Sequence, residues 1–449
     1  MVEKKTSFSP HEVLGAITVG LVSVSMGLVS GFGTISLADL PLDPNQGSWF
    51  VSVDLMIAIP FAPLGGKITQ HFGIKKTFLA CAPPIVLGWI LVGLSPSTFL
   101  LFLGRVLMAV GVTIMMVSPN VYIAETVHPD VRATLASITG FAYSLGICTL
   151  WFLGYFFSWK TVAFLSTIPT ILVFLGFLYL PDSPYWLVQN QQTEKAWASL
   201  AFFRGEKDIT EEFNEILEHH QAKSQATKLT CRTLFSRAFW LPFMSIGILH
   251  PLYQFSGTLA FTNYLQSIMN ASGIGLKTST CTLILGIVRL VASVLTLATI
   301  QKLPPKTIFG IALLIKVVAL SVLGSFFYYQ ALLRSGSWIP LAMCIILYII
   351  QPFAFSINWI LIGESFPTEI RNFAAGFLEC FGYASSSITL KCFIDMKRAL
   401  GFHGVFYFYA SVAAFTALWG FLTIQDNRSK SLVEIEKNYN CKTPLITKK

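Results

Sequence analysis

The amino-acid sequence predicts an all-α membrane protein with twelve transmembrane helices arranged as two six-helix bundles. Largely apolar stretches of about 18 to 25 residues fill most of the chain, and about 20 helical residues cross a bilayer core about 30 Å thick. Hydrophobic residues make up 54% of the 449 residues and charged residues 12%, whereas soluble domains are about 25% charged. A soluble core cannot accommodate this composition.

Apolar length and flanking turn residues place the individual spans. Six are predicted in the first half of the chain, at residues 14–36, 47–65, 76–96, 98–122, 133–157 and 160–180. Six more are predicted in the second half, at residues 238–266, 277–300, 306–328, 338–363, 372–396 and 403–424.

One long polar connection separates the two sets of spans, which suggests two pseudo-repeated halves. This linker contains the helical-looking stretch EEFNEILEHH and is expected to form three to five short helices. The predicted domains are an N-terminal six-helix bundle at 1–181, the cytoplasmic linker at 182–237, a C-terminal six-helix bundle at 238–425 and a cytoplasmic tail at 426–449.

Lysine and arginine gather on one side of the predicted membrane. With both termini on that side, it holds the linker and most of the basic loop residues, and the other side holds few. The positive-inside rule therefore predicts cytoplasmic termini in a multi-pass protein, which we expect in the plasma membrane. Asn270 then lies outside, within an Asn-Ala-Ser sequon, and is a candidate glycosylation site.

Enzymatic, metal-binding and nucleic-acid-binding functions find no support in the sequence. It has no Gly-rich phosphate loop with its lysine and no His-Glu-x-x-His motif, and its eight cysteines follow no metal-like spacing. The net charge of +9 is spread over short loops and not over one face of a compact domain. We predict a protein that is not an enzyme and needs no cofactor, with the lipid bilayer and a small-molecule solute as partners.

A glutamate and an arginine recur at one spacing in both halves. Arg132 follows Glu125 by seven residues near the end of the fourth span, and Arg371 follows Glu364 by seven after the tenth. Arg105 lies in the fourth span. Charged residues at helix ends ordinarily snorkel, but this internal echo favours ionic latches that close and open the cytoplasmic ends. We therefore predict that these five residues form a cytoplasmic gate.

Five short motifs follow one another along the chain. Two of them, after the sixth span, are specific: Pro181-Asp182-Ser183-Pro184-Tyr185-Trp186-Leu187 and Phe203-Arg204-Gly205. The others follow the second span, lie in the seventh and lie in the tail: Gly65-Gly66-Lys67-Ile68-Thr69-Gln70-His71-Phe72-Gly73, Gln254-Phe255-Ser256-Gly257 and Ser431-Leu432-Val433-Glu434-Ile435. Over residues 16–437 the chain resembles the sugar-porter family of the major facilitator superfamily, most closely the insect facilitated trehalose transporters and the facilitative glucose transporters.

This resemblance implies the major facilitator fold and facilitative uniport of hexose or trehalose by alternating access, with no ion coupling. The sugar site of that family is a polar ring at mid-membrane, because each hydroxyl taken from water must regain a hydrogen bond. Of that ring this chain keeps Gln254 and Trp359, with Tyr253, Gln351 and Asn358 as further candidates for binding substrate.

Other positions of the ring depart from the family pattern. Gly140 stands where the fifth-span glutamine is expected, and Gly382-Tyr383 replace the eleventh-span Asn-Trp pair. His250, near the seventh span, is expected to be a polar packing residue, and a role in the cavity is its alternative.

Arg289 occupies the eighth span where the family has asparagine. A guanidinium in mid-span costs a few kcal/mol or more, so it usually faces an aqueous cavity or a carboxylate. It is either a structural residue, paired with Glu379 or snorkelled, or a contact to substrate, which would favour an anionic solute. Two alternatives to sugar uniport follow: a transporter of a non-sugar or anionic organic solute that uses Arg289, and a non-transporting sugar sensor.

Overall fold

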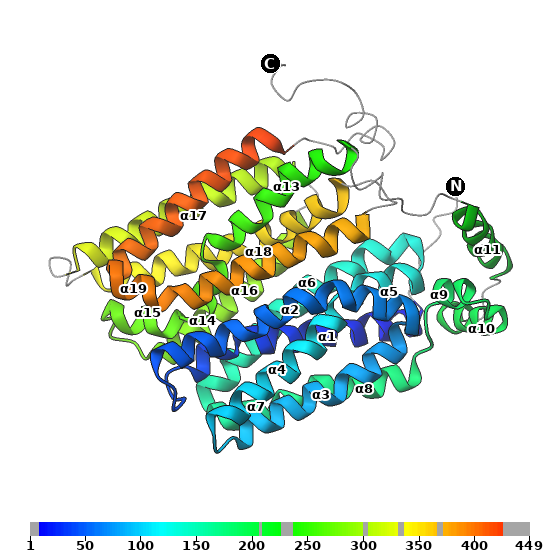
Figure 1. The fold of residues 1–449 in the computed structure, drawn as a ribbon, viewed down its shortest axis with the longest axis horizontal. Helices are drawn as coiled ribbons and strands as arrows, with labels where there is room; N and C mark the ends of the chain where they lie inside the picture. Colours follow the sequence, from blue (N-terminus) through cyan, green and yellow to red (C-terminus); the bar gives the residue numbers. More distant parts are fainter. Residues whose placement is uncertain are drawn as a thin grey trace. The chain divides into compact units, whose positions relative to one another are not determined.

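The computed structural model describes residues 9–205, 209–225, 237–299, 304–330, 336–365 and 371–424. The elements within these ranges are all α-helices, as Figure 1 shows. Among the described residues, ten helical stretches are long and apolar enough to span a membrane. One of the ten, α19 (Arg371–Thr423), covers the last two predicted spans across Gly401, and the seventh predicted span is not among the ten because it is broken into shorter helices.

The chain forms two compact units. The first lies within Met1–Ala226 and Phe261–Ser293, and the second within Thr227–Ala260 and Val294–Lys449. Residues 261–293, which the sequence places in the C-terminal bundle, thus group with the first unit. The predicted domain boundaries at 181, 237 and 425 stay a prediction.

The first six predicted spans are long helical stretches, two of them interrupted once. They are α1 (Pro10–Ser36), α2 (Pro44–Phe72), α3 (Ile74–Leu94), α4 with α5 (Thr98–Met116, Pro119–Thr126), α6 (Pro129–Phe156) and α7 with α8 (Trp159–Leu165, Thr167–Tyr179). Serine or aspartate caps the start of several of these helices. At the start of α2, for example, the Asp43 side chain accepts a hydrogen bond from the backbone N–H of Gln46.

Glycines let helices of the first unit touch through their backbones. A Cβ on Gly88 of α3 would lie 2.6 Å from the carbonyl oxygen of Gly104 on α4, and the reverse holds for Gly104. A Cβ on Gly27 of α1 or Gly146 of α6 would collide with the backbone of the facing helix. Small residues permit such close packing in membranes, where apolar surface alone does not drive helices together.

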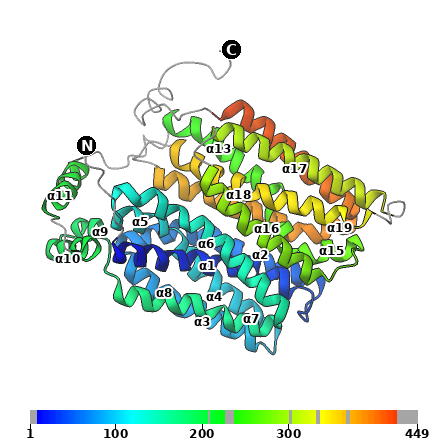
Figure 2. The ribbon, with the colours of Figure 1, turned by 180° about the vertical axis from the view of Figure 1, so that it is seen from behind.

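Three short helices occupy the described part of the linker, in agreement with the predicted short helices there. They are α9 (Pro184–Gln189), α10 (Thr193–Arg204) and α11 (Thr210–Gln225). They lie together at one end of the first unit, beside α5 and the near ends of α1 and α8, in both Figure 1 and Figure 2. Apolar side chains including Leu187, Leu200 and Phe213 form a small core of their own, so the linker is a packed subdomain.

The second half of the chain begins with the broken seventh span. It consists of α13 (Arg237–Phe255), α14 (Thr258–Asn263) and α15 (Leu265–Ser272), where the sequence predicts one continuous helix. The later spans are α16 (Thr278–Thr299), α17 (Pro305–Tyr328), α18 (Ile339–Ser365) and α19 (Arg371–Thr423). Leu249, Phe309, Leu313, Ile357 and Leu378 join α13, α17, α18 and α19 in the core of the second unit.

Candidate functional site

The predicted substrate-binding residues of the seventh span differ in their surroundings. Tyr253 is 1% exposed, and its ring lies 6.1 Å from the ring of Phe309 in the core of the second unit. Gln254, the next residue on α13, is half-buried. Gln254 is therefore the more accessible of the two candidates, and the predicted binding role of each stays a prediction.

On α18 the candidates also separate. Trp359 is 40% exposed, and the ring of Phe355, one turn earlier, lies 6.3 Å from it. The preceding residue, Asn358, is only 1% exposed. Neighbouring residues of a helix point about 100° apart, so the two side chains lie on different faces of α18. Gln351 is half-buried two turns before Asn358. Trp359 thus keeps an accessible aromatic face, whereas Asn358 belongs to a buried polar cluster.

That cluster consists of His250 on α13, Asn358 on α18 and Glu379 on α19. The Nδ1 atom of His250 lies 2.5 Å from the Nδ2 atom of Asn358, and its Nε2 atom lies 3.4 Å from Oε1 of Glu379. The space for the imidazole exists because residue 382 is glycine: a Cβ there would collide with Nε2 of His250. The ring of His250 therefore fills the place that the resemblance gives to an asparagine side chain.

Several polar atoms of this cluster have no hydrogen-bond partner in the described structure. They are Nε2 of His250, Oδ1 of Asn358 and Oε1 of Glu379. Buried polar atoms in this condition destabilise a fold by about 1–3 kcal/mol each, and ionisable residues inside a membrane are typically functional. Sequence reasoning missed the cluster, although His250 stands four residues before Gln254 and so on the same face of a helix.

Arg289 of α16 is 3% exposed, so it does not snorkel to an aqueous surface. Its guanidinium carbon lies 5.4 Å from the ring centroid of Tyr143 on α6, within the first unit. Glu379, its predicted partner, lies in the second unit beside His250. The contact with Tyr143 is a cation–π interaction, which stabilises a desolvated guanidinium by about 2 kcal/mol. The ion pair with Glu379 stays a prediction.

The predicted cytoplasmic gate can be followed only in part. Glu125 is half-buried at the end of α5. Arg132, Glu364 and Arg371 lie on α6, α18 and α19, but their side chains fall outside the described residues. The ionic latches therefore stay a prediction.

Arg105, the fifth residue of the predicted gate, has partners that lie away from Glu125. Its guanidinium binds Oδ2 of Asp54 at 3.0 Å and donates to the carbonyl oxygens of Phe50 and Val29. These partners lie toward the start of α2 and the end of α1, whereas Glu125 lies near the start of α1. Arg105 is 1% exposed. Arg105 therefore links α4 to α1 and α2, at the opposite end of the unit from Glu125.

A buried ionic network at the linker end of the first unit was not predicted. Arg204, at the end of α10, binds Oε1 of Glu12 at 2.5 Å and both carboxylate oxygens of Glu212 at 2.6 and 2.8 Å. It also donates to the carbonyl oxygen of Thr126, and Glu12 accepts from the backbone N–H of His128. The network ties the linker to α1 and α5. The Phe203-Arg204-Gly205 motif was the only signal for it in the sequence.

A second carboxylate, that of Asp182 in the Pro181–Leu187 motif, also makes several contacts in the first unit. Oδ1 of Asp182 accepts from the backbone N–H groups of Ile74, Lys75 and Ser183, and so caps the start of α3. Burial raises the pKa of the Asp182 carboxyl above its ordinary value, and its backbone donors oppose that rise. The Nζ of Lys75 donates to the carbonyl oxygens of Leu178 and Leu180, which fixes the end of α8.

Gly73→Ala is expected to lower the melting temperature, because Gly73 has a φ of +87° and a Cβ there would collide with the Asp182 carboxylate. Strained backbone alone costs about 1–3 kcal/mol, and a Cβ there would also displace the cap of α3. Gly205→Ala is the matched control, because Gly205 has a φ of +69° but open space around its Cβ. Thermal unfolding in detergent should show the larger loss for Gly73→Ala; equal losses would mean that the contact with Asp182 contributes nothing.

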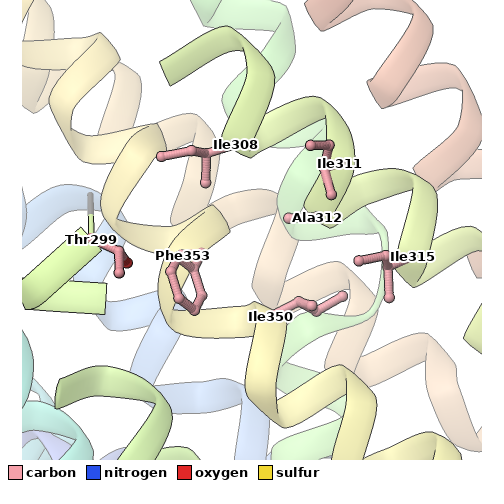
Figure 3. Close-up of a pocket in the computed structure, with 7 residues that line it drawn as sticks. All are labelled: Thr299, Ile308, Ile311, Ala312, Ile315, Ile350 and Phe353. Carbon is pink, nitrogen blue, oxygen red and sulfur yellow. The ribbon is translucent and has the colours of Figure 1, made fainter. Parts of the chain in front are cut away.

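The described part of the second unit also holds an apolar groove, about 190 Å³ in volume, which Figure 3 shows. Ile308, Ile311, Ala312 and Ile315 of α17 line it together with Thr299, Ile350 and Phe353. The Thr299 hydroxyl donates to the carbonyl oxygen of Leu295. A sugar would find almost no hydrogen-bond partners in this groove, whose lining suits an acyl chain.

Three comparisons with known proteins agree with this architecture. The family model described as sugar (and other) transporter matches residues 32–439. The chain is 29% identical to a facilitated trehalose transporter Tret1-2 homolog of Drosophila sechellia, over 98% of this chain and 93% of the relative. It is 28% identical to the facilitated trehalose transporter Tret1 of Culex quinquefasciatus, over 96% and 86%. The partially occluded inward open structure of the E. coli xylose transporter XylE has the same fold: it covers 94% of this chain and 100% of its own, with a TM-score of 0.79 and 17% identity.

Proposed function

The chain belongs to the sugar (and other) transporter family, and we propose that it carries trehalose or a hexose across a membrane by facilitated transport. The family match from residue 32 to residue 439, through both units of the chain, carries this proposal. Relatives described as facilitated trehalose transporters align with almost the whole chain, which favours trehalose as the first substrate to test.

The described side chains support a sugar as the solute. A sugar hydroxyl leaves water only if it regains a hydrogen bond, and Gln254 offers both a donor and an acceptor on a half-buried turn of α13. The exposed indole of Trp359 offers a flat apolar face on which a sugar ring stacks. We propose that these two residues hold the sugar, one by hydrogen bonds and the other by contact area.

Uptake into proteoliposomes tests the function directly. Purified protein should carry radiolabelled trehalose or glucose with saturable kinetics, and unlabelled sugar should compete. Facilitated transport moves solute only down its gradient, so the internal sugar should rise to the external concentration and stop there, with or without a proton or sodium gradient. Accumulation above the external level that a protonophore abolishes would contradict uniport, and saturable binding without uptake would favour a sensor.

Trp359→Ala should raise KM for the transported sugar about tenfold, because removing a stacked aromatic forfeits about 1.4 kcal/mol. Trp338→Ala is the matched control: Trp338 is 64% exposed and precedes the start of α18. Initial uptake rates over a range of sugar concentrations give both KM values. If the two variants behave alike, Trp359 does not face the sugar.

A second candidate function rests on Arg289. Its guanidinium is buried against Tyr143, and in a low-dielectric site such a charge attracts anions strongly. A transporter of an anionic organic solute would therefore be inhibited more by sugar acids or sugar phosphates than by neutral sugar. Arg289→Asn should abolish that preference. Equal competition by neutral and anionic sugars, unchanged in the variant, would exclude this alternative.

We further propose that both termini are cytoplasmic and that the protein resides in the plasma membrane. Asn270 is exposed at the end of α15, as a glycan acceptor must be. Asn270→Gln should abolish the mobility shift that a glycosidase produces in protein from eukaryotic cells. Asn427→Gln, which removes the other sequon, should leave the shift intact, and the reverse result would invert the proposed orientation.

A further inference from the structure

The seventh span bends between α13 and α14, at Ser256 and Gly257. Gly257 has a φ of +85°, a conformation that favours glycine, and a Cβ there would lie 2.5 Å from the ring of Tyr409 on α19. The bend is closed locally by two backbone bonds, from Ser256 N–H to Leu252 and from Gly257 N–H to Gln254. A broken helix inside a membrane must satisfy its freed polar groups from elsewhere in the protein.

A lysine from another helix completes this bend. The Nζ atom of Lys316, on α17, donates to Oγ of Ser256 at 2.6 Å and to Oγ1 of Thr258 at 2.9 Å. It thereby joins the residues on either side of Gly257. The hydroxyl of Ser256 donates onward to the carbonyl oxygen of Tyr253 at 2.5 Å. A continuous chain of hydrogen bonds thus links Lys316 to the last turn of α13.

The electrostatics explain why a lone cation is tolerated there. Lys316 is 7% exposed, and an ammonium in mid-span costs several kcal/mol unless it is compensated. Its Nζ lies at the C-terminal end of α13, where the helix dipole favours positive charge, and 5.2 Å above the ring of Tyr253. Two hydroxyls, a helix end and an aromatic face together stabilise it, and its described contacts include no carboxylate.

Lys316 differs from the other residues that α17 turns toward the core of the second unit. Between Pro305 and Tyr328 the charged residues are Lys306, at the start of the helix, and Lys316. All other positions that α17 turns toward the second-unit core are apolar, among them Phe309 and Leu313. A methionine at 316 would fill the same space without any charge, so burial alone does not require lysine here.

We propose that Lys316 is a positioning residue that fixes the bend of the seventh span and thereby sets the orientation of Gln254 for substrate. Gln254 lies two residues before Ser256, and its carbonyl accepts the backbone bond that closes the bend. A turn that loosens at Ser256 changes the direction of the Gln254 side chain first. The proposal rests on the proposed sugar transport for its effect on substrate, but its effect on the bend is independent of it.

Lys316→Met is the decisive variant, because it removes the charge and keeps an unbranched apolar side chain. The described contacts of Lys316 include no carboxylate, so its removal strands no opposite charge, and the melting temperature should stay close to that of the wild type. KM should rise about tenfold, the equivalent of one lost hydrogen bond to sugar, with little change in maximal rate. Lys306→Met, at the start of the same helix, should leave KM unchanged.

A double-mutant cycle then tests the route of the effect. Thr258→Val removes one acceptor of Lys316 with little change in size. If Lys316 acts through the bend, the loss in Lys316→Met with Thr258→Val should be clearly smaller than the sum of the two single losses. Additive losses, or an unchanged KM in Lys316→Met, would overturn the proposal.

Hydrogen–deuterium exchange provides a readout that needs no sugar. In Lys316→Met the peptide covering residues 252–258 should exchange faster, whereas the peptides of α17 should not, and Lys306→Met should match the wild type. Unchanged exchange at the bend would overturn the proposal even if transport is altered. Faster exchange in a protein that carries neither trehalose nor glucose would keep Lys316 as the anchor of the bend and reject the proposed function instead.

Discussion

Arg204→Ala is expected to lower the free energy of unfolding of the first unit by about 3–5 kcal/mol, because it leaves a buried carboxylate without its partner. Arg204 and Glu12 each have side chains only 4% exposed, and their contact joins α10 to the first turn of α1. Glu212, whose side chain is 28% exposed, can turn to water instead. Most of the loss therefore comes from Glu12.

Thermal unfolding and limited proteolysis of the linker measure this effect. Lys195→Ala is the control on α10, because the side chain of Lys195 donates to Gln192 at an exposed site, and it should be close to neutral. Glu12→Gln made together with Arg204→Met should recover part of the loss, since no unpaired charge then stays buried. If Arg204→Ala melts like Lys195→Ala and the linker resists protease equally, the network does not hold the linker.

Apolar length was sufficient to predict where the membrane spans lie. The helices α1, α3 and α17 reproduce the predicted positions because about 20 apolar residues have no other stable arrangement in a bilayer. The same signal failed at the seventh span, where apolarity continues through the bend. Gly257 lies at that bend, and Lys316 of another helix contacts it. A contact from another helix cannot be predicted from the local sequence.

The candidate site was predicted less completely than the fold. Gln254 and Trp359 are candidates because they lie where the resemblance expects substrate-binding residues, and their roles stay predictions. Arg105 lies near the start of the fourth span, which begins outside when both termini are cytoplasmic, and its contact with Asp54 depends on packing that no motif shows. Glu379 was paired with the most conspicuous intramembrane arginine, whereas packing brings it to His250. Pairing across helices is decided by the fold and is not visible in spacing.

Glycine at position 382, where the resemblance leads us to expect asparagine, has a clear physical reason in this structure. A side chain at 382 and the imidazole of His250 cannot both occupy the space between α13 and α19. Glycine at 382 and histidine at 250 therefore depend on each other in this structure. With the imidazole in place, Asn358 and Glu379 lie close to it.

Gly382→Asn should consequently disable the protein instead of restoring a family-like site. Overpacking a well-filled core costs about 1–3 kcal/mol, and here the displaced group is a buried imidazole that contacts two other helices. We expect a lower melting temperature and a loss of sugar uptake of about tenfold or more. Gly376→Asn, on the same helix, is the control: its Cβ would meet no atom within 4 Å, and it should be tolerated.

Removing the imidazole as well makes the test decisive. His250→Ala alone opens a cavity and leaves the side chains of Asn358 and Glu379 without their shared partner, so it should also be destabilising. In the double variant, Gly382→Asn with His250→Ala, the new amide occupies the vacated space and can donate to Glu379. Its melting temperature and uptake should exceed those of both single variants. Losses that simply add would show that the two positions do not compete for one space, and the cluster would then be no substitute for the sugar-binding asparagine of the family.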